Sequence, residues 1–265
     1  MVPFLLSCRF VLIRGSSLSV FSVSSVYSVV SLVLRTGTTN HMRKQTTEYT
    51  EENGKNGRRR RQLDSQRCII VDYGTGNLNS IKRTLDRVSV ESEISSSIED
   101  IRAADKIIFP GVGHFGNAMS NLHAAGLIDI LNEVVLEKRT PILGICLGME
   151  LMAKRGDEGN VAGLGWIDAE AVRFDIQEKV PHMGWNQIAA KRASTLIEGI
   201  DENTEFYFAH AYHLRLNDPA DILTETQYGI AFPSAIEKGN IFGVQFHPEK
   251  SHDAGGRLLK NFADM

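Results

Sequence analysis

Continuous apolar runs that alternate with amphipathic stretches constrain the fold of this chain more than any other feature. Residues 68–73 and 106–109 are short apolar runs ended by turn residues, and such runs are typical of strands buried on both faces. A third run, residues 141–146, leads directly into residues 147–153, where the apolar spacing predicts a helix. Because strands that alternate with helices form parallel sheets covered by helices, we expect a single doubly wound α/β domain with a mostly parallel central sheet.

The second half of the chain has a different pattern, with shorter strands separated by turns. After Gly163 the sequence predicts strands at residues 206–214 and 240–246 and a closing helix near residues 253–262. The strand–helix alternation starts at Arg67, and no internal repeat is visible. We therefore expect one globular domain over residues 67–265, a usual size for a domain with its own core.

Residues 1–66 differ from the rest in composition. We expect an N-terminal extension that is disordered, or that lies upstream of a true start at Met42 or a later codon. It holds ten basic and four acidic side chains, and residues 15–34 include eight serines. So many serines disfavour a transmembrane helix or a secretory signal, whereas an Arg- and Ser-rich, acid-poor segment fits an organelle transit peptide. The run Arg58–Arg61 fits a nucleic-acid or nuclear-import patch, but such runs in polar linkers are more often solvated charge.

Charge and cysteine content narrow the class of protein. The whole chain has a net charge of −3, and residues 67–265 alone carry nineteen basic and twenty-eight acidic side chains, which argues against a general nucleic-acid binder. The three cysteines, Cys8, Cys68 and Cys146, are too widely spaced for a zinc site or a disulfide framework. The sequence thus predicts a reduced, cytoplasmic protein with no metal, no cofactor and no nucleic-acid or membrane partner; a transit peptide would instead direct it to an organelle.

Residues 144–148 have the form Gly-x-nucleophile-x-Gly at a junction between strand and helix. In such an elbow a sharp turn exposes one side chain, here Cys146, and the glycines permit close packing. A thiol at the start of a helix also meets unpaired N–H groups that favour its thiolate. A buried apolar cysteine at a strand end is the alternative interpretation, and the motif alone leaves both open. Cys68 and Cys8 have no such setting.

A second motif, Gln245–Ser251, contains His247 and Glu249 on either side of a proline. A cysteine nucleophile needs a base that takes its proton and a third group that orients the base. Side chains two apart on an extended segment point to the same side, so Glu249 is placed to hold His247. The alternative is a surface loop with an incidental His–Glu pair.

A glycine-rich loop follows the run at residues 106–109. Residues 111–116 match the dinucleotide fingerprint G-x-G-x-x-G, but that fingerprint belongs on the first strand–helix unit of a dinucleotide-binding domain, and here it lies on a later unit. We therefore expect the backbone N–H groups of this loop to face the substrate of the cysteine as an oxyanion hole.

The three motifs together resemble those of the class I glutamine amidotransferases, and within that class the glutaminase subunits of imidazole glycerol phosphate synthase from histidine biosynthesis. The stretches Pro-Gly-Val-Gly-His-Phe-Gly at residues 110–116 and Pro-His-Met-Gly-Trp-Asn at residues 181–186 point to that branch. The elbow and the His-Pro-Glu stretch are shared by the wider class. The resemblance covers residues 67–265, with matching stretches at residues 72–78, 110–116, 144–149, 181–186, 206–210 and 239–251.

The resemblance implies a class I amidotransferase fold and a glutaminase that uses a Cys146–His247–Glu249 triad. The cysteine attacks the side-chain amide of glutamine, the histidine acts as base and then as acid, and the glutamate orients the histidine. The implied oxyanion donors are the N–H groups of Val112, Gly113 and Leu147. The implied substrate-binding residues are Gly111, Glu150, His210, Ala211 and Tyr212.

The resemblance also implies a partner, because the glutaminase of this branch passes ammonia to a separate cyclase subunit. That subunit is a (β/α)₈ barrel, and the two form a heterodimer that makes imidazole glycerol phosphate and an aminoimidazole carboxamide ribotide. The positions that match the partner-facing surface of the family are Asn77, Trp185 and Lys250.

Two positions depart from the family pattern, and both lie in glutamine binding. After Cys-Leu-Gly-Met the family normally has Gln, where this chain has Glu150; its charge either pairs with the substrate ammonium or repels the substrate carboxylate. The family usually has Ser or Thr where this chain has Ala211. Two alternatives therefore stay open: a paralogous glutaminase serving another synthase, such as a surface-polysaccharide sugar amidotransferase, and a catalytically impaired interaction subunit.

Overall fold

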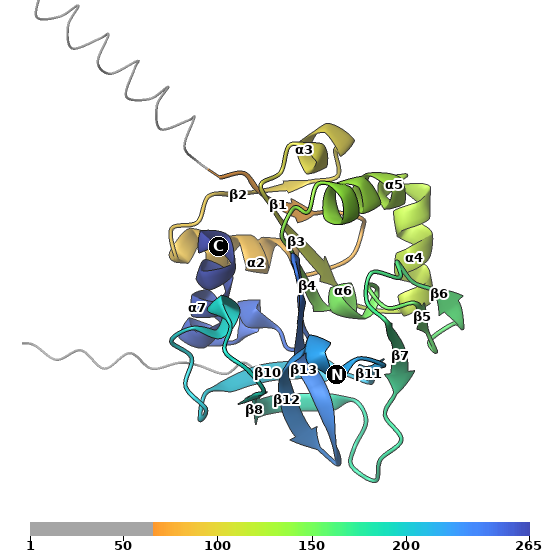
Figure 1. Ribbon diagram of the computed structural model, residues 1–265, viewed down its shortest axis with the longest axis vertical. Coiled ribbons are helices and arrows are strands. Elements are labelled where there is room, and N and C mark those ends of the chain that lie inside the picture. The colour runs from red at the N-terminus through yellow and green to blue at the C-terminus, as the bar shows by residue number, and fades with distance from the viewer. Residues whose placement is uncertain (1–65) are drawn as a thin grey trace, which may run out of the picture. The chain divides into compact units, whose positions relative to one another are not determined.

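The computed structural model describes residues 66–265, and their centre is an eight-stranded sheet (Figure 1). Its strand order is β2-β1-β3-β4-β14-β13-β12-β9. The first four pairings in that order are parallel and the last three are antiparallel, so the predicted α/β fold with a mostly parallel central sheet is confirmed. The strands are β1 (Cys68–Val71), β2 (Ser92–Ser95), β3 (Lys106–Gly111), β4 (Ile142–Cys146), β9 (Ala189–Ala190), β12 (Ile222–Tyr228), β13 (Ile230–Lys238) and β14 (Ile241–Val244).

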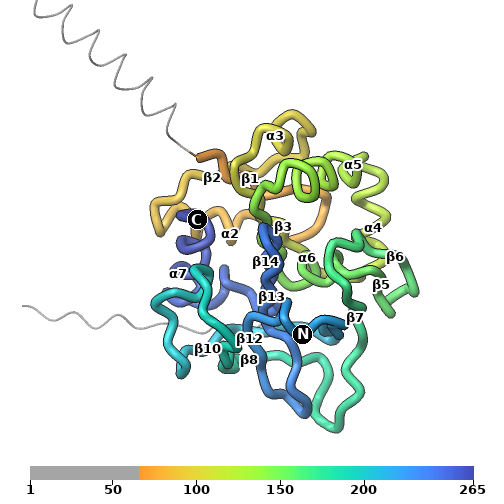
Figure 2. Tube along the Cα trace, in the orientation of Figure 1, coloured from red at the N-terminus to blue at the C-terminus, as the bar shows by residue number. Residues whose placement is uncertain are grey.

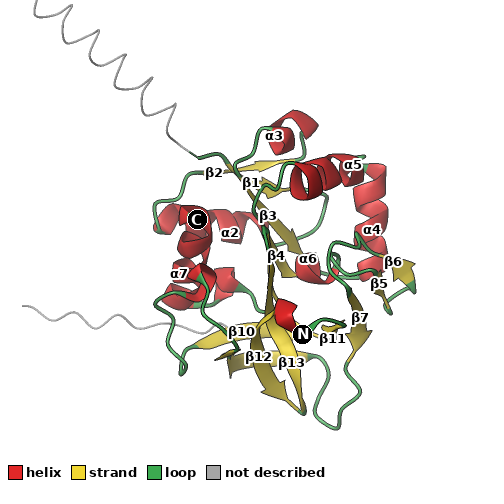
Figure 3. Ribbon diagram, in the orientation of Figure 1, coloured by secondary structure: helices red, strands yellow, loops and turns green. Residues whose placement is uncertain are grey.

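Helices cover both faces of the parallel part of this sheet, as a doubly wound domain requires (Figure 3). On one face lie α3 (Ile98–Arg102), α4 (Phe115–Ala124), α5 (Leu127–Asn132) with the π-helical turn Glu133–Glu137, and α6 (Leu147–Glu150). On the other face lie α2 (Leu78–Arg87) and α7 (His252–Asp264).

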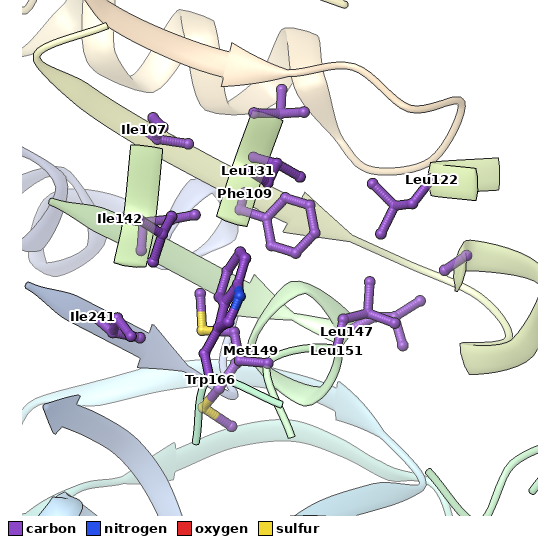
Figure 4. Packing of buried hydrophobic residues seen from close by; sticks show 14 of the residues in the cluster. Ile107, Phe109, Leu122, Leu131, Ile142, Leu147, Met149, Leu151, Trp166 and Ile241 are labelled. Atoms are coloured by element: carbon purple, nitrogen blue, oxygen red, sulfur yellow. The ribbon is translucent and has the colours of Figure 1, made fainter. Parts of the chain in front are cut away.

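Side chains that alternate along each strand divide the core into two clusters. Ile107 and Phe109 of β3 point to one face and pack with Leu131 of α5 and with Trp166 (Figure 4). Ile108, between them, points to the other face, where it joins apolar side chains of α2 and α7. Because both faces are buried, these strands read in the sequence as continuous apolar runs instead of an alternating pattern.

Two smaller sheets are formed by strands that lie between β4 and β12 in the sequence. One pairs β8 (His182–Gln187) with β10 (Glu205–His210). The other has the order β11-β7-β5-β6, built from β5 (Arg155–Gly156), β6 (Val161–Ala162), β7 (Ala169–Arg173) and β11 (Tyr212–Leu216).

Three elements differ from the sequence prediction. The strand predicted at residues 206–214 is two strands, because β10 and β11 join different sheets and the chain turns between them at Ala211. The helix predicted over residues 147–153 ends at Glu150, and turns follow it. Pro110 and Gly111 do not stop β3 but are its last two residues, where Gly111 pairs with Cys146.

The predictions for residues 1–65 lie outside the described residues; these are the extension, the alternative start at Met42 and the Arg58–Arg61 patch. The domain boundary at residues 66 and 67 therefore stays a prediction. Within residues 66–265, no helix combines the length and apolar character needed to cross a membrane.

Candidate active site

Cys146 lies at the turn where β4 ends and α6 begins, in a backbone conformation that few non-glycine residues adopt. Its φ is 54° and its ψ is −113°. The elbow is tight because a Cβ on Gly148 would lie 1.9 Å from the carbonyl oxygen of Phe109, and a Cβ on Gly111 would lie 2.7 Å from the backbone nitrogen of Gly148. The two glycines thus let the end of β3 touch the start of α6, as the nucleophile-elbow motif predicts.

The electrostatic setting of the Cys146 thiol differs from the one expected at a helix start. The side chain is only 6% exposed, and burial raises its pKa above the ordinary range, as does the charge of Glu150. The hydrogen bond to the backbone of Leu147 lowers the pKa, but by less than burial and the Glu150 charge raise it. The helix start thus favours the thiolate, as expected, but burial and the Glu150 charge outweigh it, and the thiol needs a base to lose its proton.

His247 and Glu249 form the pair that the His-Pro-Glu motif predicts, although the geometry is different. They meet across the 3₁₀ turn Pro248–Lys250 and not along an extended segment. The Nδ1 atom of His247 lies 2.9 Å from Oε1 of Glu249, and His247 is 2% exposed. Because an ionised carboxylate only accepts hydrogen bonds, Nδ1 carries the hydrogen and Nε2 keeps its lone pair for a proton.

The Glu249 carboxylate has a second donor that the sequence did not suggest. Asn77 Nδ2 donates to the same Oε1 atom at 2.9 Å. Burial alone would raise the pKa of Glu249, but the hydrogen bond and charge of His247, together with the Asn77 bond, hold it below its ordinary value. Asn77, expected at a partner-facing surface, therefore lies beside Glu249.

Neighbouring strands bring the His247 turn to the end of the sheet that holds the cysteine. β4 and β14 are adjacent and parallel, with Ile145 opposite Val244, so the chain leaves both strands at one edge (Figure 2). The charges of Glu249 and Lys250 both act on the Cys146 thiol. The backbone N–H of His247 donates to the Tyr207 carbonyl at 2.8 Å, which ties the turn to β10.

The glycine loop after β3 is held by two side chains from the β1–α2 loop. Tyr73 Oη donates to the Pro110 carbonyl at 2.7 Å, and the Thr75 hydroxyl donates to the Val112 carbonyl. The Thr75 hydroxyl also accepts from the Val112 N–H at 3.3 Å. Of the expected oxyanion donors, Leu147 thus lies next to the cysteine, Val112 is bonded to Thr75, and Gly113 has a φ of 102° with open space on its Cβ side.

The expected substrate-binding residues lie around the same edge. Glu150 is 5% exposed, and its Oε1 accepts from Gln245 Nε2 at 2.8 Å. Burial raises the pKa of Glu150 to about 7, the Gln245 hydrogen bond opposes this, and the charge of Glu158 adds to it. Burial also raises the pKa of the Tyr212 phenol, and the charges of Glu158 and Glu150 raise it further.

Buried histidines anchor the junction between β10 and β11, which carries the other expected substrate-binding residues His210, Ala211 and Tyr212. His210 Nδ1 lies 2.7 Å from the Tyr212 carbonyl, and His210 Nε2 lies 3.0 Å from His182 Nδ1. Because the carbonyl can only accept, His210 carries its hydrogen on Nδ1 and accepts from His182 at Nε2. Ala211 forms the corner between these two anchored residues and offers its carbonyl to the Phe174 N–H at 3.1 Å.

The surface expected to face a partner exposes apolar side chains. Trp185 is 42% exposed and stacks on His252 with ring centroids 5.0 Å apart, and Lys250 lies 5.5 Å from the centre of the Tyr207 ring. Met183, two residues before Trp185 on the same face of β8, is 63% exposed and was not predicted.

Sequence reasoning missed four residues of this site: Thr75, Glu158, Gln245 and Met183. Gln245 is the first residue of the Gln245–Ser251 motif, two residues before His247, so its place in that motif was the one available signal. Glu158 lies in a turn between β5 and β6, and its Oε2 accepts from the Phe115 N–H at 2.7 Å. Acidic turn residues are too common to mark a site. Among residues 66–265 no group of side chains has the composition of a metal centre.

Comparison with known proteins supports one family. The family model "Glutamine amidotransferase class-I" matches residues 69–265. "Imidazole glycerol phosphate synthase subunit HisH 2" of Pseudomonas aeruginosa is 46% identical over 199 residues, covering 74% of this chain and 98% of that protein. The protein of the same name from Methanococcus maripaludis is 46% identical over 195 residues, covering 73% of this chain and 96% of that protein.

Solved structures show the same fold at lower identity. A crystal structure of a glutamine amidotransferase aligns with a TM-score of 0.60 at 21% identity, covering 74% of this chain and 99% of that one. The structure of PurLQS from Thermotoga maritima aligns with a TM-score of 0.59 at 16% identity, covering 76% of this chain and 98% of the matched one. With the family model spanning nearly all the described residues and relatives at 46% identity, the chain belongs to the class I glutamine amidotransferases.

Proposed function

We propose that this chain is the glutaminase subunit of an imidazole glycerol phosphate synthase, with Cys146, His247 and Glu249 as its catalytic residues. The observation that carries the proposal is the hydrogen-bonded His247–Glu249 pair, which follows the strand next to the one that ends in the strained Cys146 elbow. The relatives at 46% identity, which carry this synthase subunit's name, support the choice of synthase.

In the proposed reaction, His247 Nε2 takes the thiol proton as Sγ of Cys146 attacks the side-chain amide carbon of glutamine. The tetrahedral intermediate collapses when His247 returns the proton to the leaving nitrogen, which releases ammonia and leaves a glutamyl thioester. Water, deprotonated by the same imidazole, then attacks the thioester and releases glutamate. Glu249 keeps Nδ1 protonated and stabilises the imidazolium.

The oxyanion of each intermediate needs N–H donors at the elbow. We assign this role to the backbone N–H groups of Leu147, Val112 and Gly113. Leu147 follows the nucleophile directly. Val112 has to exchange its hydrogen bond to Thr75 for the oxyanion, so the Thr75 hydroxyl competes with substrate for this donor.

The ammonia passes, in this proposal, to a cyclase subunit with a (β/α)₈ barrel. The exposed face of β8 is the proposed docking surface, with Trp185 and Met183 at its centre and Lys250 at its edge. Aromatic and methionine side chains are enriched at protein interfaces, and this face lies beside the His247 turn because His247 is bonded to β10. Asn77 couples the surface to the triad through Glu249.

A paralogous glutaminase that serves a different synthase is the second candidate. The observations that favour it are Glu150 and Ala211, which stand where the family normally has Gln and a hydroxyl residue. The catalytically impaired subunit is disfavoured, because the nucleophile, base and orienting carboxylate are all present with coherent hydrogen bonds.

The test combines the full chain with a cyclase partner and its ribotide substrate, and measures glutamate and the imidazole product. The proposal expects both products in the wild type and neither from Cys146→Ala. Glutamate without imidazole product would favour the paralogue. Wild-type turnover that persists in Cys146→Ala would remove Cys146 as the nucleophile, and no glutamate in any combination would contradict the glutaminase assignment.

A further inference from the structure

Two buried imidazoles lie behind the junction between β10 and β11, and they are bonded to each other. His182 of β8 stands directly opposite His210 of β10 in the paired strands. Its Nδ1 lies 3.0 Å from Nε2 of His210, and both side chains are buried. The His182 ring stacks on the Tyr228 and Phe208 rings, with centroids 4.0 Å and 4.8 Å away. The position of this ring is therefore set by packing, and the hydrogen bonds that it makes are set by its neighbours.

Asn186, four residues further along β8, determines which nitrogen of His182 carries the hydrogen. Its Oδ1 accepts from the Gln187 N–H at 2.9 Å, and its Nδ2 donates to the Gln227 carbonyl at 3.1 Å, so the amide has one possible orientation. Nδ2 also lies 3.3 Å from Nε2 of His182. Because an amide NH₂ group only donates, Nε2 of His182 accepts, and the hydrogen of the neutral ring is on Nδ1.

The Tyr212 carbonyl imposes the same direction from the other end. It lies 2.7 Å from Nδ1 of His210 and can only accept, so His210 also carries its hydrogen on Nδ1 and accepts from His182 at Nε2. Burial lowers the pKa of His182 to about 4 and that of His210 to about 3, which keeps both rings neutral at pH 7. Moving the hydrogen of either ring to its other nitrogen would set two donors or two lone pairs against each other.

This network, from Asn186 through the two imidazoles to the Tyr212 carbonyl, ends at the corner that carries expected substrate-binding residues. Ala211 has no polar side-chain atom, so the polar groups that it offers to a ligand belong to the backbone. Its carbonyl accepts from the Phe174 N–H at 3.1 Å, and the next carbonyl, that of Tyr212, accepts from His210. Because a peptide unit is planar, holding a carbonyl also fixes the N–H on its opposite side. The network therefore determines how the corner faces the site.

We propose that His182 and Asn186 are positioning residues for the substrate: they hold His210 in its Nδ1–H form, and His210 holds the Ala211–Tyr212 corner in the orientation that binds glutamine. The inference rests on the proposed glutaminase function and adds two residues that act through another residue and not on the substrate directly. It gives the buried side chains of β8 a role in the site, beside the docking role proposed for its exposed side chains. The competing interpretation is that His182 only fills space in an aromatic cluster.

Two substitutions of His182 separate these interpretations. His182→Phe keeps a ring for stacking and removes the donor to His210, whereas His182→Asn loses the ring but keeps an N–H donor on Cγ, where Nδ1 stands. Glutamate release is measured with the cyclase partner present. We expect KM for glutamine to rise roughly tenfold in His182→Phe with kcat within about threefold of wild type, and most of this loss to be recovered in His182→Asn. A KM near wild type in His182→Phe, or a higher KM in His182→Asn than in His182→Phe, would overturn the inference.

His213 provides the matched control. It is also buried, and its ring lies 4.6 Å from that of Phe174, but its Nδ1 faces the Leu214 carbonyl and it is outside the network. His213→Phe should leave KM within about twofold of wild type, even if chemical unfolding shows a loss of stability. An equal rise of KM in His213→Phe would mean that any buried histidine in this region has the same effect, and the proposed network would have no special role.

A spectroscopic measurement on the wild type does not depend on any variant folding. Nitrogen NMR of the full chain labelled with ¹⁵N-histidine, with rings assigned through their backbone resonances, reports which nitrogen of each ring is protonated. At pH 7 both His182 and His210 should be neutral with the hydrogen on Nδ1. A hydrogen on Nε2 in either ring would overturn the inference. Failure of the proposed function looks different, since the wild type would then release no glutamate while the two rings kept the same tautomers.

Discussion

At the scale of single residues, one oxygen atom connects the candidate base to the rest of the site. Glu249 Oε1 accepts from both His247 and Asn77, whereas Oε2 is buried and has no partner among residues 66–265. A glutamine at this position can keep both bonds to its amide oxygen, with its NH₂ group at the place of Oε2. The substitution therefore removes the charge with little change in geometry.

Glu249→Gln should lower kcat for glutamine hydrolysis by roughly 10²–10⁴-fold with little change in KM, because the imidazolium formed during catalysis loses its counter-charge. Steady-state glutamate release measures both parameters. Asn77→Ala is the matched comparison, since it removes a neutral donor and keeps the charge, and its loss should be much smaller. A kcat within threefold of wild type in Glu249→Gln would show that the carboxylate charge is not needed.

The residues that carry chemistry differ in how far the sequence reveals them. Cys146, His247 and Glu249 lie in short motifs whose spacing reflects a local turn, so they could be predicted as candidates. Thr75 and Glu158 contact the site through loops distant in the sequence. No local pattern records such contacts. The family resemblance placed Asn77 at a partner-facing surface, and its bond to Glu249 became visible only in three dimensions.

At the scale of elements, the start of α7 positions the turn that carries His247 and Glu249. Gly255 packs so closely under this turn that a Cβ would lie 1.8 Å from the carbonyl oxygen of Pro248. Its neighbour Gly256 has more room, with Val88 Cγ1 at 3.1 Å as the nearest atom to an added Cβ. Both lie inside one helix, where alanine is intrinsically favoured over glycine by about 1 kcal/mol.

Gly255→Ala should therefore destabilise the protein, by roughly 1–3 kcal/mol for the forced repacking, and should reduce glutaminase activity by displacing His247 and Glu249. Gly256→Ala should change stability by less than about 1 kcal/mol and leave activity near wild type. Chemical unfolding and glutamate release on the two variants measure both effects. Equal stability and activity in the two variants would mean that the Pro248 contact does not position the turn.

Helices and strands could be predicted from the sequence where their buried residues follow a regular pattern along the chain. The parallel strands β1, β3 and β4 were predicted because they are buried on both faces, and the closing helix because of its apolar spacing. The break between β10 and β11 could not be predicted, because residues on both sides of Ala211 have strand character and only the pairing with two different sheets separates them. The short α6 likewise ends where the chain turns toward β5, a tertiary requirement.

At the scale of the whole molecule, buried titratable groups from several elements determine the response to acid. Burial lowers the pKa of His182 to about 4 and that of His210 to about 3, and it also lowers the pKa of His213. Burial raises the pKa of Glu150 to about 7. Between pH 5 and 6 the unfolded chain protonates His182 and His210 while the folded chain keeps them neutral, and the folded chain alone protonates Glu150. These three groups leave the unfolded state with about one proton more, and His213, whose pKa is also lowered, adds to the difference.

Stability should therefore decrease as the pH falls from 6.5 to 5, by roughly 1–2 kcal/mol per pH unit near pH 5, since each proton of difference contributes about 1.4 kcal/mol. Urea unfolding at several pH values measures the slope. Glu150→Gln removes the one opposing group of the four, so the decrease should become steeper by about one proton. A stability that stays level from pH 6.5 to 5 would show that the histidines are not buried in their neutral form.

The architecture as a whole was predicted from the sequence, since alternation of strands and helices fixed the class of fold. The sequence could not provide the arrangement of the two small sheets, because their strands are short and pair with distant partners. It also could not decide the ionisation of Glu150, which depends on burial and on Glu158, eight residues further along the chain.

The place of β14 between β4 and β13 has a consequence for synthesis on the ribosome. Every other strand of the described residues emerges before β14, so a growing chain holds Cys146 about a hundred residues before it holds His247. Until residues 241–251 have been made, β4 has an open edge and Cys146 has no imidazole beside it. In the proposed mechanism an unfinished chain therefore cannot hydrolyse glutamine. Only protein molecules whose sheet is complete can release ammonia at this site.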